Sequence, residues 1–411
     1  MAENIVSYAE RAFDTFDERP FNSVDSLILA WFSYFHLNGA FEGVSDGEAL
    51  SLTRLYRSEL FDDMFRDFWD APSTKRLFAA VMASRRFRDM RALHYVESFD
   101  SAEEKQFAAV SFQLTDELAY VAFRGTDSSL IGWKEDFSMA FKSPVAAQES
   151  AARYLGEAAK HLRGALLVGG HSKGGNLAVY AAAECDRAVQ DRIARVYSHD
   201  GPGFLESVLQ RESFGRIAGR IEKTLPQSSV VGMLLEHQER YSIVKSNRVS
   251  FLQHDPFSWL VENNAFVPFS HLTSDAIYLD HTISGWLAQL SEADRARFVD
   301  ALFEILSAND ITTVDEWKAG WPKNVPAAVR ALSQMNPRHE NLPHQHAARA
   351  GRAEPEELPR ALQKAGRRPQ CGFLSANAHA TRRQCRFLSA PRVSTRLFAA
   401  WGRLESGRLS V

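Results

Sequence analysis

Residues 165–184 read ALLVGGHSKGGNLAVYAAAE, and this stretch decides the fold that we expect. A short apolar run is followed by two glycines, a His-Ser pair and a helix-forming run rich in alanine. This order predicts a buried strand that turns directly into a helix. Gly170 and Gly174 leave room for a tight turn, so the spacing G-x-S-x-G places Ser172 at its corner.

A serine at such a corner is a candidate nucleophile. The first N–H groups of the following helix, beginning with that of Lys173, face the reacting oxygen, and the helix dipole there favours negative charge. The alternative is a glycine-rich turn that binds phosphate or only packs. Because the stretch lacks G-x-G-x-x-G spacing and its lysine precedes the second glycine, we favour a nucleophile at Ser172, with its hydroxyl exposed at the carboxyl edge of a sheet.

Short apolar runs alternate with helical stretches on both sides of this corner. The runs at 106–114, 118–123, 165–168, 193–197 and 241–251 predict strands, and those at 148–162 and 176–184 predict helices. The alternation predicts an α/β fold with a mostly parallel sheet covered by helices on both faces.

Three regions follow from the composition along the chain. Residues 1–90 repeat apolar side chains every three to four positions and predict a helical N-terminal segment that packs on the core. Residues 91–335 form the core, and they end in two amphipathic helices that we expect over 280–306. Residues 336–411 are rich in Arg, Ala and Pro and predict a basic, disordered tail.

Charge is distributed unevenly between body and tail. Residues 338–411 hold 14 Lys and Arg against 5 Asp and Glu, so the tail carries a surplus of nine positive charges and the rest of the chain about −12. An acidic body argues against a nucleic-acid-binding protein. A basic tail leaves an anchor on anionic membranes as an alternative role for that segment.

Cysteine usage and the N-terminus predict a cytoplasmic location. The three cysteines, Cys185, Cys371 and Cys385, include no C-x-x-C pair, so they predict neither a disulfide framework nor a zinc site. The N-terminus lacks the basic and apolar regions of a signal peptide, and no apolar run approaches the ~20 residues of a membrane span. We expect no metal and no organic cofactor, and the sequence does not indicate an oligomeric state.

Several further motifs precede and follow the corner in a fixed order. They are NSVDSLILAWFSYF at 22–35, FRGTDSSLIGWKEDF at 123–137, GHSKGGNLAVYAA at 170–182, VYSHDGPGF at 196–204, PQSSVVGMLLEH at 226–237 and QHDPFSW at 253–259. Together they resemble the Mbeg1-like family, bacterial proteins similar to class 3 lipases of the α/β-hydrolase superfamily. The resemblance extends from about Asn22 to about Trp317, and it implies an α/β-hydrolase fold.

The resemblance also implies a second oxyanion donor. In class 3 lipases an FRGT-like turn after a strand supplies it, which here is the backbone N–H of Thr126, opposite that of Lys173. The stretch from Asp127 to Trp133 would lie where those lipases carry a mobile lid. We expect Arg124 to be a structural ion-pair partner of Asp136.

A serine hydroxyl attacks only when a base takes its proton and an acid orients that base. In this fold the chain order is Ser, then Asp or Glu, then His, and two assignments satisfy it. In the first, Asp255 is the acid, as in class 3 lipases, and His281 or His271 is the base. In the second, Asp200 follows the strand at 193–197 and orients His254. Both assignments stay open at this stage.

These observations predict a lipase- or esterase-like serine hydrolase that cleaves an ester or thioester of a small acyl substrate through an acyl-enzyme on Ser172. The alternative is a catalytically inactive hydrolase-fold protein that binds a ligand or partner in the same pocket. A lysine at 173, where lipases commonly carry an apolar residue, predicts a cation beside the oxyanion site that attracts acidic substrates. His171 is expected to pack against or support the loop.

Overall fold

The computed structural model describes residues 3–68, 70–100, 105–127, 134–136, 138–139, 142–235, 240–273, 291, 293–297 and 299–300. The chain divides into two units, Met1–Gly320 and Trp321–Val411, and the second lies outside the described residues. The predicted tail at 336–411 therefore lies outside them as well, as do His281 and most of the helices predicted over 280–306.

The strands of the described residues are β1 Leu50–Ser51, β2 Arg91–Asp100, β3 Lys105–Thr115, β4 Leu118–Phe123, β5 Ala165–His171, β6 Ile193–His199, β7 Ile221–Pro226, β8 Tyr241–Val244, β9 Val261–Glu262 and β10 Ala265–Phe266. The α-helices are α1 Ile5–Arg11, α2 Ser23–Phe32, α3 Asn38–Phe41, α4 Phe61–Met64, α5 Ala71–Ala83, α7 Ala146–His161, α8 Lys173–Glu184, α9 Arg187–Arg192, α10 Glu206–Leu209 and α11 Glu212–Ala218. Short 3₁₀ helices are η1 Leu52–Arg54, η2 Ser58–Leu60, η3 Val231–Met233, η4 Ser250–His254 and η5 Pro256–Ser258. Within these described residues, no helix combines the length and the apolar character needed to cross a bilayer.

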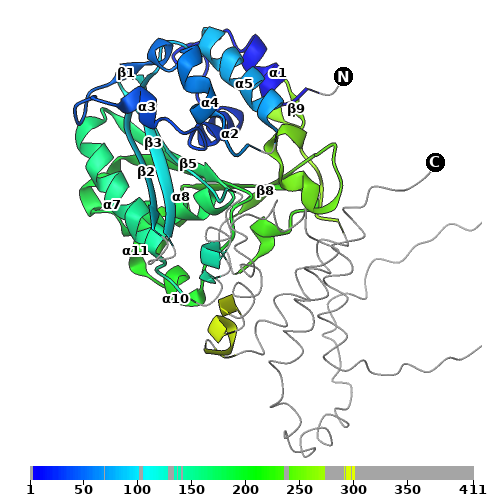
Figure 1. Ribbon diagram of the computed structural model, residues 1–411. Coiled ribbons are helices and arrows are strands. Elements are labelled where there is room, and N and C mark those ends of the chain that lie inside the picture. The colour runs from blue at the N-terminus through cyan, green and yellow to red at the C-terminus, as the bar shows by residue number, and fades with distance from the viewer. Residues whose placement is uncertain are drawn as a thin grey trace, which may run out of the picture. The chain divides into compact units, whose positions relative to one another are not determined.

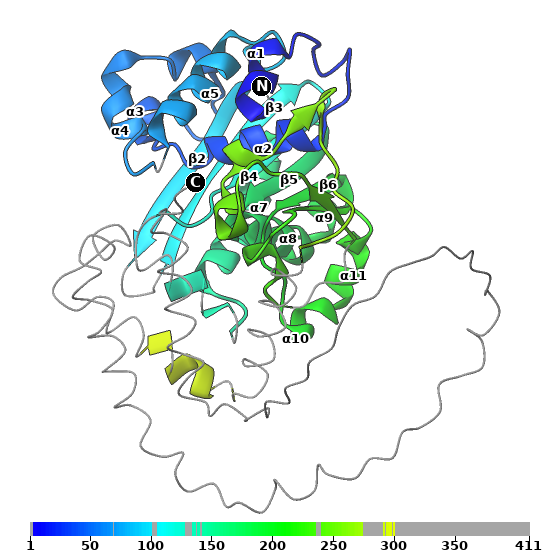
Figure 2. The same cartoon turned by 90° about the vertical axis from the view of Figure 1, so that its right-hand side faces the viewer.

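Strands β1 to β8 form one sheet in chain order. β1 to β4 pair antiparallel, with the long strands β2 and β3 side by side, and β4 to β8 pair parallel (Figure 2). The predicted α/β class with a mostly parallel sheet is confirmed. Five of these strands were not predicted. β1, β9 and β10 have two residues each, whereas β2 and β7 mix charged and apolar residues and owe their extended state to pairing with their neighbours.

Helices cover both faces of this sheet, as predicted. Figure 1 shows α2 and α5 on one side of it and α7 and α8 on the other. The side chains of β4 alternate accordingly: Tyr120 and Ala122 belong to the cluster under α2, whereas Val121 and Phe123 belong to the cluster under α7 and α8. Each face of the central strands is therefore buried, which explains their continuous apolar runs.

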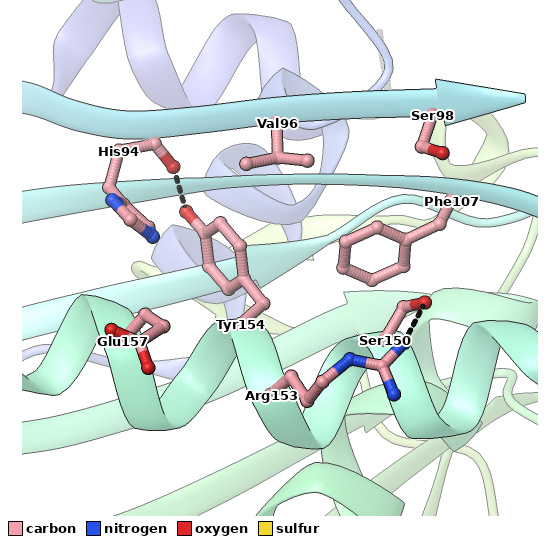
Figure 3. A pocket seen from close by; sticks show the side chains of 8 residues that line it. All are labelled: His94, Val96, Ser98, Phe107, Ser150, Arg153, Tyr154 and Glu157. Carbon is pink, nitrogen blue, oxygen red and sulfur yellow. Dashed lines mark hydrogen bonds between the residues drawn. The ribbon is translucent and has the colours of Figure 1, made fainter. Parts of the chain in front are cut away.

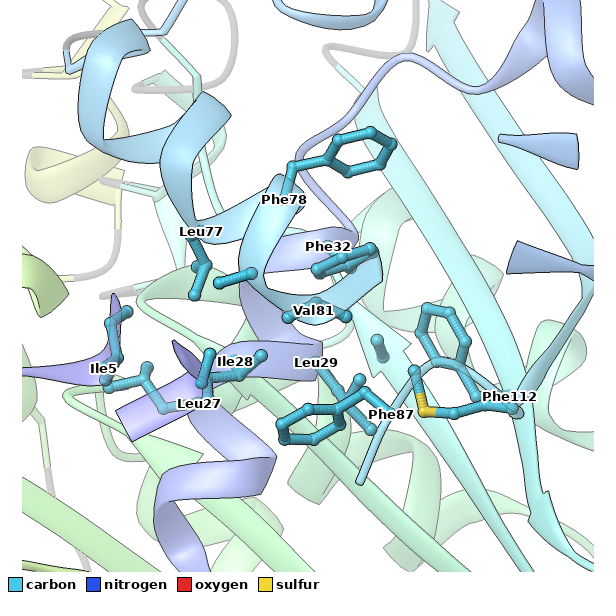
Figure 4. Packing of buried hydrophobic residues seen from close by; sticks show 14 of the residues in the cluster. Ile5, Leu27, Ile28, Leu29, Phe32, Leu77, Phe78, Val81, Phe87 and Phe112 are labelled. Atoms are coloured by element: carbon cyan, nitrogen blue, oxygen red, sulfur yellow. The ribbon is translucent and has the colours of Figure 1, made fainter. Parts of the chain in front are cut away.

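The N-terminal segment packs on the sheet through aromatic and aliphatic side chains. Phe32 of α2 stacks on Phe78 of α5 with ring centroids 5.8 Å apart, and it meets Phe112 of β3 edge to face (Figure 4). All three rings are fully buried or nearly so. The aromatic residues of this segment therefore form core, and they fix the position of α2 on the sheet.

A buried ion pair anchors the start of α2. Asn22 caps the helix and Asp25 completes a capping box with it. The Asp25 carboxylate also accepts two hydrogen bonds from the Arg86 guanidinium, at 2.7 and 2.5 Å, and neither side chain is exposed. Because both charges are removed from water, each depends on the other for compensation.

We expect Arg86→Met to lower the free energy of unfolding by about 3–5 kcal/mol, because it leaves the Asp25 carboxylate buried without its cation. Urea denaturation measures this. Arg85→Met is the matched control, since Arg85 pairs with Glu18 at the surface with both side chains about half exposed, and it should leave the unfolding midpoint close to that of the wild type. Equal effects of the two variants would contradict the assignment of Arg86–Asp25 as the anchor.

Candidate active site

The backbone turns sharply at Ser172, between the end of β5 and the first residue of α8. Ser172 has φ 59° and ψ −134°, a backbone conformation that residues other than glycine rarely adopt. Its N–H donates to the carbonyl of His199 in β6 at 2.9 Å, which ties the corner to the neighbouring strand. A Cβ on Gly174 would lie 2.2 Å from the Phe123 carbonyl oxygen, and one on Gly170 would lie 2.2 Å from the Gly174 carbonyl.

The corner therefore has the strained geometry that the sequence predicts. The predicted exposure of Ser172 is wrong, because only 9% of the residue is accessible and it lies below the surface. The reason is the close packing around the corner: a Cβ on Gly125 of the turn after β4 would lie 3.1 Å from the Ser172 Cβ.

A histidine–carboxylate pair forms between two loops at the carboxyl edge of the sheet. Nδ1 of His254, at the end of η4, donates to Oδ2 of Asp200 at 2.6 Å. Asp200 directly follows β6 and is fully buried, whereas the His254 side chain is 30% exposed. Since Nδ1 carries the proton toward the carboxylate, Nε2 of the neutral ring is its acceptor nitrogen.

The Asp200 carboxylate is held in place by more than His254. Its Oδ1 accepts from the Ser229 hydroxyl at 2.5 Å and from the Gly232 N–H at 3.2 Å. A side chain on Gly232 would collide with this oxygen, since its Cβ would lie 2.4 Å away. Both contacts come from the segment after β7, so this segment fixes the orientation of the acid.

The His254 ring lies beside the nucleophile corner. Its centroid is 4.6 Å from that of His171, the residue that immediately precedes Ser172. Among the described residues, no hydrogen bond joins the Ser172 hydroxyl to His254, and such contacts are often loose before substrate binds. The structure thus joins Asp200 to His254, the acid and base of the second assignment, and places the ring against His171, the residue before Ser172.

Asp255 has different contacts from those the first assignment requires. Its Oδ1 caps η5 by accepting from the Phe257 N–H at 2.9 Å, and its Oδ2 pairs with Arg248 at 2.5 Å. Burial raises the pKa of this carboxyl, and the Phe257 N–H and Arg248 oppose the shift. The carboxylate of Asp255 thus contacts a helix N-terminus and an arginine, and its role as the acid stays a prediction because His281, its proposed partner, lies outside the described residues.

Of the other two predicted bases, the structure describes only His271. His271 is exposed, and its Nδ1 bonds to the hydroxyl of the adjacent Ser270 at 2.7 Å rather than to a carboxylate. His281 lies outside the described residues, so its role stays a prediction. Within the described residues, no group of three or more His, Cys, Asp or Glu side chains is arranged to hold a metal ion.

The two residues predicted as oxyanion donors occupy the expected elements. Thr126 lies in the turn after β4, and its hydroxyl donates to Oδ2 of Asp136 at 2.5 Å. Lys173 is the first residue of α8, where a backbone N–H has no partner within the helix. Their use as oxyanion donors stays a prediction.

The side chain of Lys173 departs from the prediction of a cation that attracts acidic substrates. It is fully buried, and its ammonium pairs with Glu135 at 3.0 Å and lies 3.8 Å from Asp136. Because two carboxylates surround it, it presents no positive charge to a ligand. The ion pair expected between Arg124 and Asp136 is also wrong, since Arg124 pairs with Glu97 at 2.7 Å.

The sequence profile of the Mbeg1-like family matches residues 81–304, which is more than half of the 411 residues. The chain belongs to the Mbeg1-like family. Among curated protein sequences, no significant match was found.

Solved structures similar to this Mbeg1-like protein are lipases. They include the M37 lipase (14% identity, TM-score 0.32, covering 51% of this chain and 68% of that one) and the native Rhizomucor miehei lipase propeptide complex (12%, 0.32, 70% and 80%). A third is the lipase from Rhizopus microsporus var. chinensis (14%, 0.33, 58% and 78%).

One residue beside the corner of this Mbeg1-like chain is not predicted from the sequence: Tyr34, from the segment after α2. Its hydroxyl lies 3.2 Å from Nδ1 of His171, and a Cβ on Gly125 would lie 2.1 Å from the same hydroxyl. Burial raises the pKa of Tyr34 above its ordinary range, so the phenol stays neutral. The motif at 22–35 contains this residue, but nothing in the motif indicates that it reaches the turn after β4.

His171 supports the loop that carries the candidate base. Its Nε2 donates to the backbone carbonyl of His254 at 2.9 Å, which leaves Nδ1 to face the Tyr34 hydroxyl. Burial, together with the nearby His254, lowers the pKa of His171 well below its ordinary value, so the ring is neutral and keeps one donor and one acceptor. This agrees with the predicted supporting role.

A hollow of about 280 Å³ lies elsewhere in the Mbeg1-like fold, between β2 and α7. Figure 3 shows Phe107 and Tyr154 pointing into it, with Arg153 and Glu157 along the helix. None of its lining residues belongs to the corner, the His254–Asp200 pair or the turn at Thr126. We therefore do not assign the substrate to this hollow.

Proposed function

We propose that this Mbeg1-like protein is a serine hydrolase that cleaves an ester or thioester through an acyl-enzyme on Ser172. One observation supports the proposal: the residue before the strained Ser172 is in ring contact with a histidine whose Nδ1 is bonded to a buried carboxylate. Strained backbone conformations persist mostly at functional sites, where the position of a side chain matters.

The first chemical step uses the neutral His254 as general base. Nε2 takes the proton of the Ser172 hydroxyl while Oγ forms a bond to the carbonyl carbon of the substrate. Asp200 keeps Nδ1–H oriented and stabilises the imidazolium that forms. The C–O or C–S bond to the leaving group then breaks, and His254 returns the proton to the departing oxygen or sulfur.

The second step releases the acyl group. Water enters, His254 takes its proton, and the resulting hydroxide attacks the acyl carbon so that the bond to Ser172 Oγ breaks and the proton returns to the serine. In both steps the backbone N–H groups of Thr126 and Lys173 stabilise the negative oxygen of the tetrahedral intermediate. No cofactor takes part in this sequence.

We propose an uncharged acyl group as the substrate class. Aromatic side chains surround the corner: Trp31 lies 4.7 Å from Tyr34, 5.9 Å from His171 and 5.3 Å from Phe257, measured between ring centroids. Lys173, which follows Ser172 in sequence, is paired with carboxylates. Apolar rings without an available cation favour an acyl chain or small lipid over an acidic substrate.

The test uses the whole chain with a small fluorophosphonate probe and a panel of p-nitrophenyl esters from acetate to octanoate. We expect covalent labelling with a mass increase of one probe per chain and turnover of at least one ester. A chain that is folded, remains unlabelled and turns over no ester or thioester would contradict the proposal. Binding of an acyl ligand without turnover would instead support the catalytically inactive alternative.

A further inference from the structure

The ammonium of Lys173 lies in the interior of the protein, directly behind the nucleophile corner. Nζ donates to Oε2 of Glu135 at 3.0 Å and to the backbone carbonyl of Gln106 at 3.2 Å, and no part of the side chain is exposed. Removing an ammonium from water is unfavourable by several kcal/mol unless charged partners surround it. A long side chain that begins at the edge of a candidate site is therefore directed inward by specific partners.

Glu135 joins three elements through this contact. Its Oε2 accepts from the Gln106 N–H at 3.2 Å as well as from Lys173, and its Oε1 accepts from the Ala147 N–H at 2.9 Å in the first turn of α7. The carboxylate thus connects the start of β3, the start of α7 and the start of α8. All of these contacts are buried.

The neighbouring carboxylate, Asp136, completes a connection to the turn after β4. Its Oδ2 accepts from the Thr126 hydroxyl, while its Oδ1 lies 3.8 Å from the Lys173 ammonium. That Oδ1 is buried and has no hydrogen-bond partner among the described residues. The side chains of the two residues whose N–H groups we propose as oxyanion donors therefore converge on one pair of carboxylates, Glu135 and Asp136.

We infer that Lys173 is a positioning residue: its ammonium, held by Glu135 and Asp136, fixes the separation between the Thr126 and Lys173 amides and thereby the width of the oxyanion hole. This inference rests on the proposed function. Oxyanion donors act only when they are held about 3 Å from the developing charge, so a displacement of either turn weakens transition-state binding more than substrate binding.

The pKa of the Asp136 carboxyl depends on the ammonium of Lys173. Burial raises the pKa of Asp136 to about 6, and Glu135 contributes to the increase, whereas Lys173, the Thr126 hydroxyl and His254 lower it. Tyr34 faces the same carboxyl and stays neutral. Loss of the ammonium should raise the pKa of Asp136 further, so the acidic limb of the pH–rate profile should move to higher pH.

The test compares kcat, KM and melting temperature of the wild type with those of Lys173→Met/Glu135→Gln. The double variant removes both partners of the closer ion pair, Asp136 can take up a proton once the ammonium is gone, and the melting temperature reports whether the chain still folds. We expect kcat to fall by ~10- to 100-fold, as for a displaced oxyanion donor, with KM within about threefold. Asp136→Asn is the second variant. It keeps the Lys173–Glu135 pair, removes the negative charge that faces both the Thr126 hydroxyl and the Lys173 ammonium, and should lower kcat in the same way.

Lys160→Met is the control, because Lys160 pairs with Glu157 at the surface with its side chain 63% exposed, and it should leave kcat unchanged. The inference is overturned if the folded double variant retains the kcat and pH profile of the wild type. If the double variant does not fold, the same result with Asp136→Asn overturns it. A wild-type chain without labelling or turnover would instead refute the proposed function itself, and the inference with it.

Discussion

Ser172→Ala should abolish fluorophosphonate labelling and lower kcat for the best ester by ~10⁴-fold or more, because the acyl-enzyme cannot form without the hydroxyl. Labelling is measured by intact mass and turnover by release of p-nitrophenol. The melting temperature should not fall. Alanine has the same backbone requirement as serine at φ 59°, and the substitution removes only one oxygen from the corner.

The matched control for this variant is Ser246→Ala. Ser246 is also buried, but its hydroxyl donates to Ser258 at 2.8 Å, away from the corner. It should be labelled as the wild type is. Persistent labelling of Ser172→Ala at the wild-type rate would show that another nucleophile reacts, and the proposed acyl-enzyme would be wrong.

Asp200→Asn should lower kcat by ~10³- to 10⁴-fold with KM little changed, since the amide favours the wrong tautomer of His254 and cannot stabilise its cation. The parallel variant His254→Ala should lose activity to a similar extent. Because the Asp200 carboxylate accepts from Ser229, Gly232 and His254, its replacement also leaves a donor without its charged acceptor. Stability is therefore measured for each variant.

Asp255→Asn separates the two assignments of the acid. The residue adjoins His254 in sequence, yet its carboxylate contacts Phe257 and Arg248. We expect kcat within about threefold of the wild type, because the substitution affects a helix cap and an ion pair and not the charge on the base. A large loss of kcat in Asp255→Asn together with full activity of Asp200→Asn would restore the first assignment.

Local sequence was sufficient for the nucleophile corner and for the central strands. Gly170, Ser172 and Gly174 lie within one turn, so neighbouring residues alone meet the steric requirement of the corner. The strands β4, β5 and β6 are buried on both faces, and their apolar runs are visible without knowledge of their partners. The strand β2 lacks such a run, and its pairing with β3 was needed to identify it.

The acid and the base were not decided by sequence for a physical reason. The chain order Ser, Asp, His admits both Asp200 and Asp255, and either carboxylate follows a strand or precedes a proline in a plausible loop. Which one reaches an imidazole depends on where the segment after β8 returns to the sheet. The contacts of Asp200 with Ser229, Gly232 and His254 join positions that are far apart along the chain.

The amino-acid sequence alone thus determined the strand–turn–helix corner, the layered α/β fold and the membership of Ser172 in its turn, because short-range sterics and apolar periodicity decide those features. Tertiary structure decided the pairing of Asp200 with His254, the inward course of the Lys173 side chain and the contact of Tyr34 with the corner. Those features depend on distances between residues remote in sequence, which only the packing of the sheet, its helices and its loops sets.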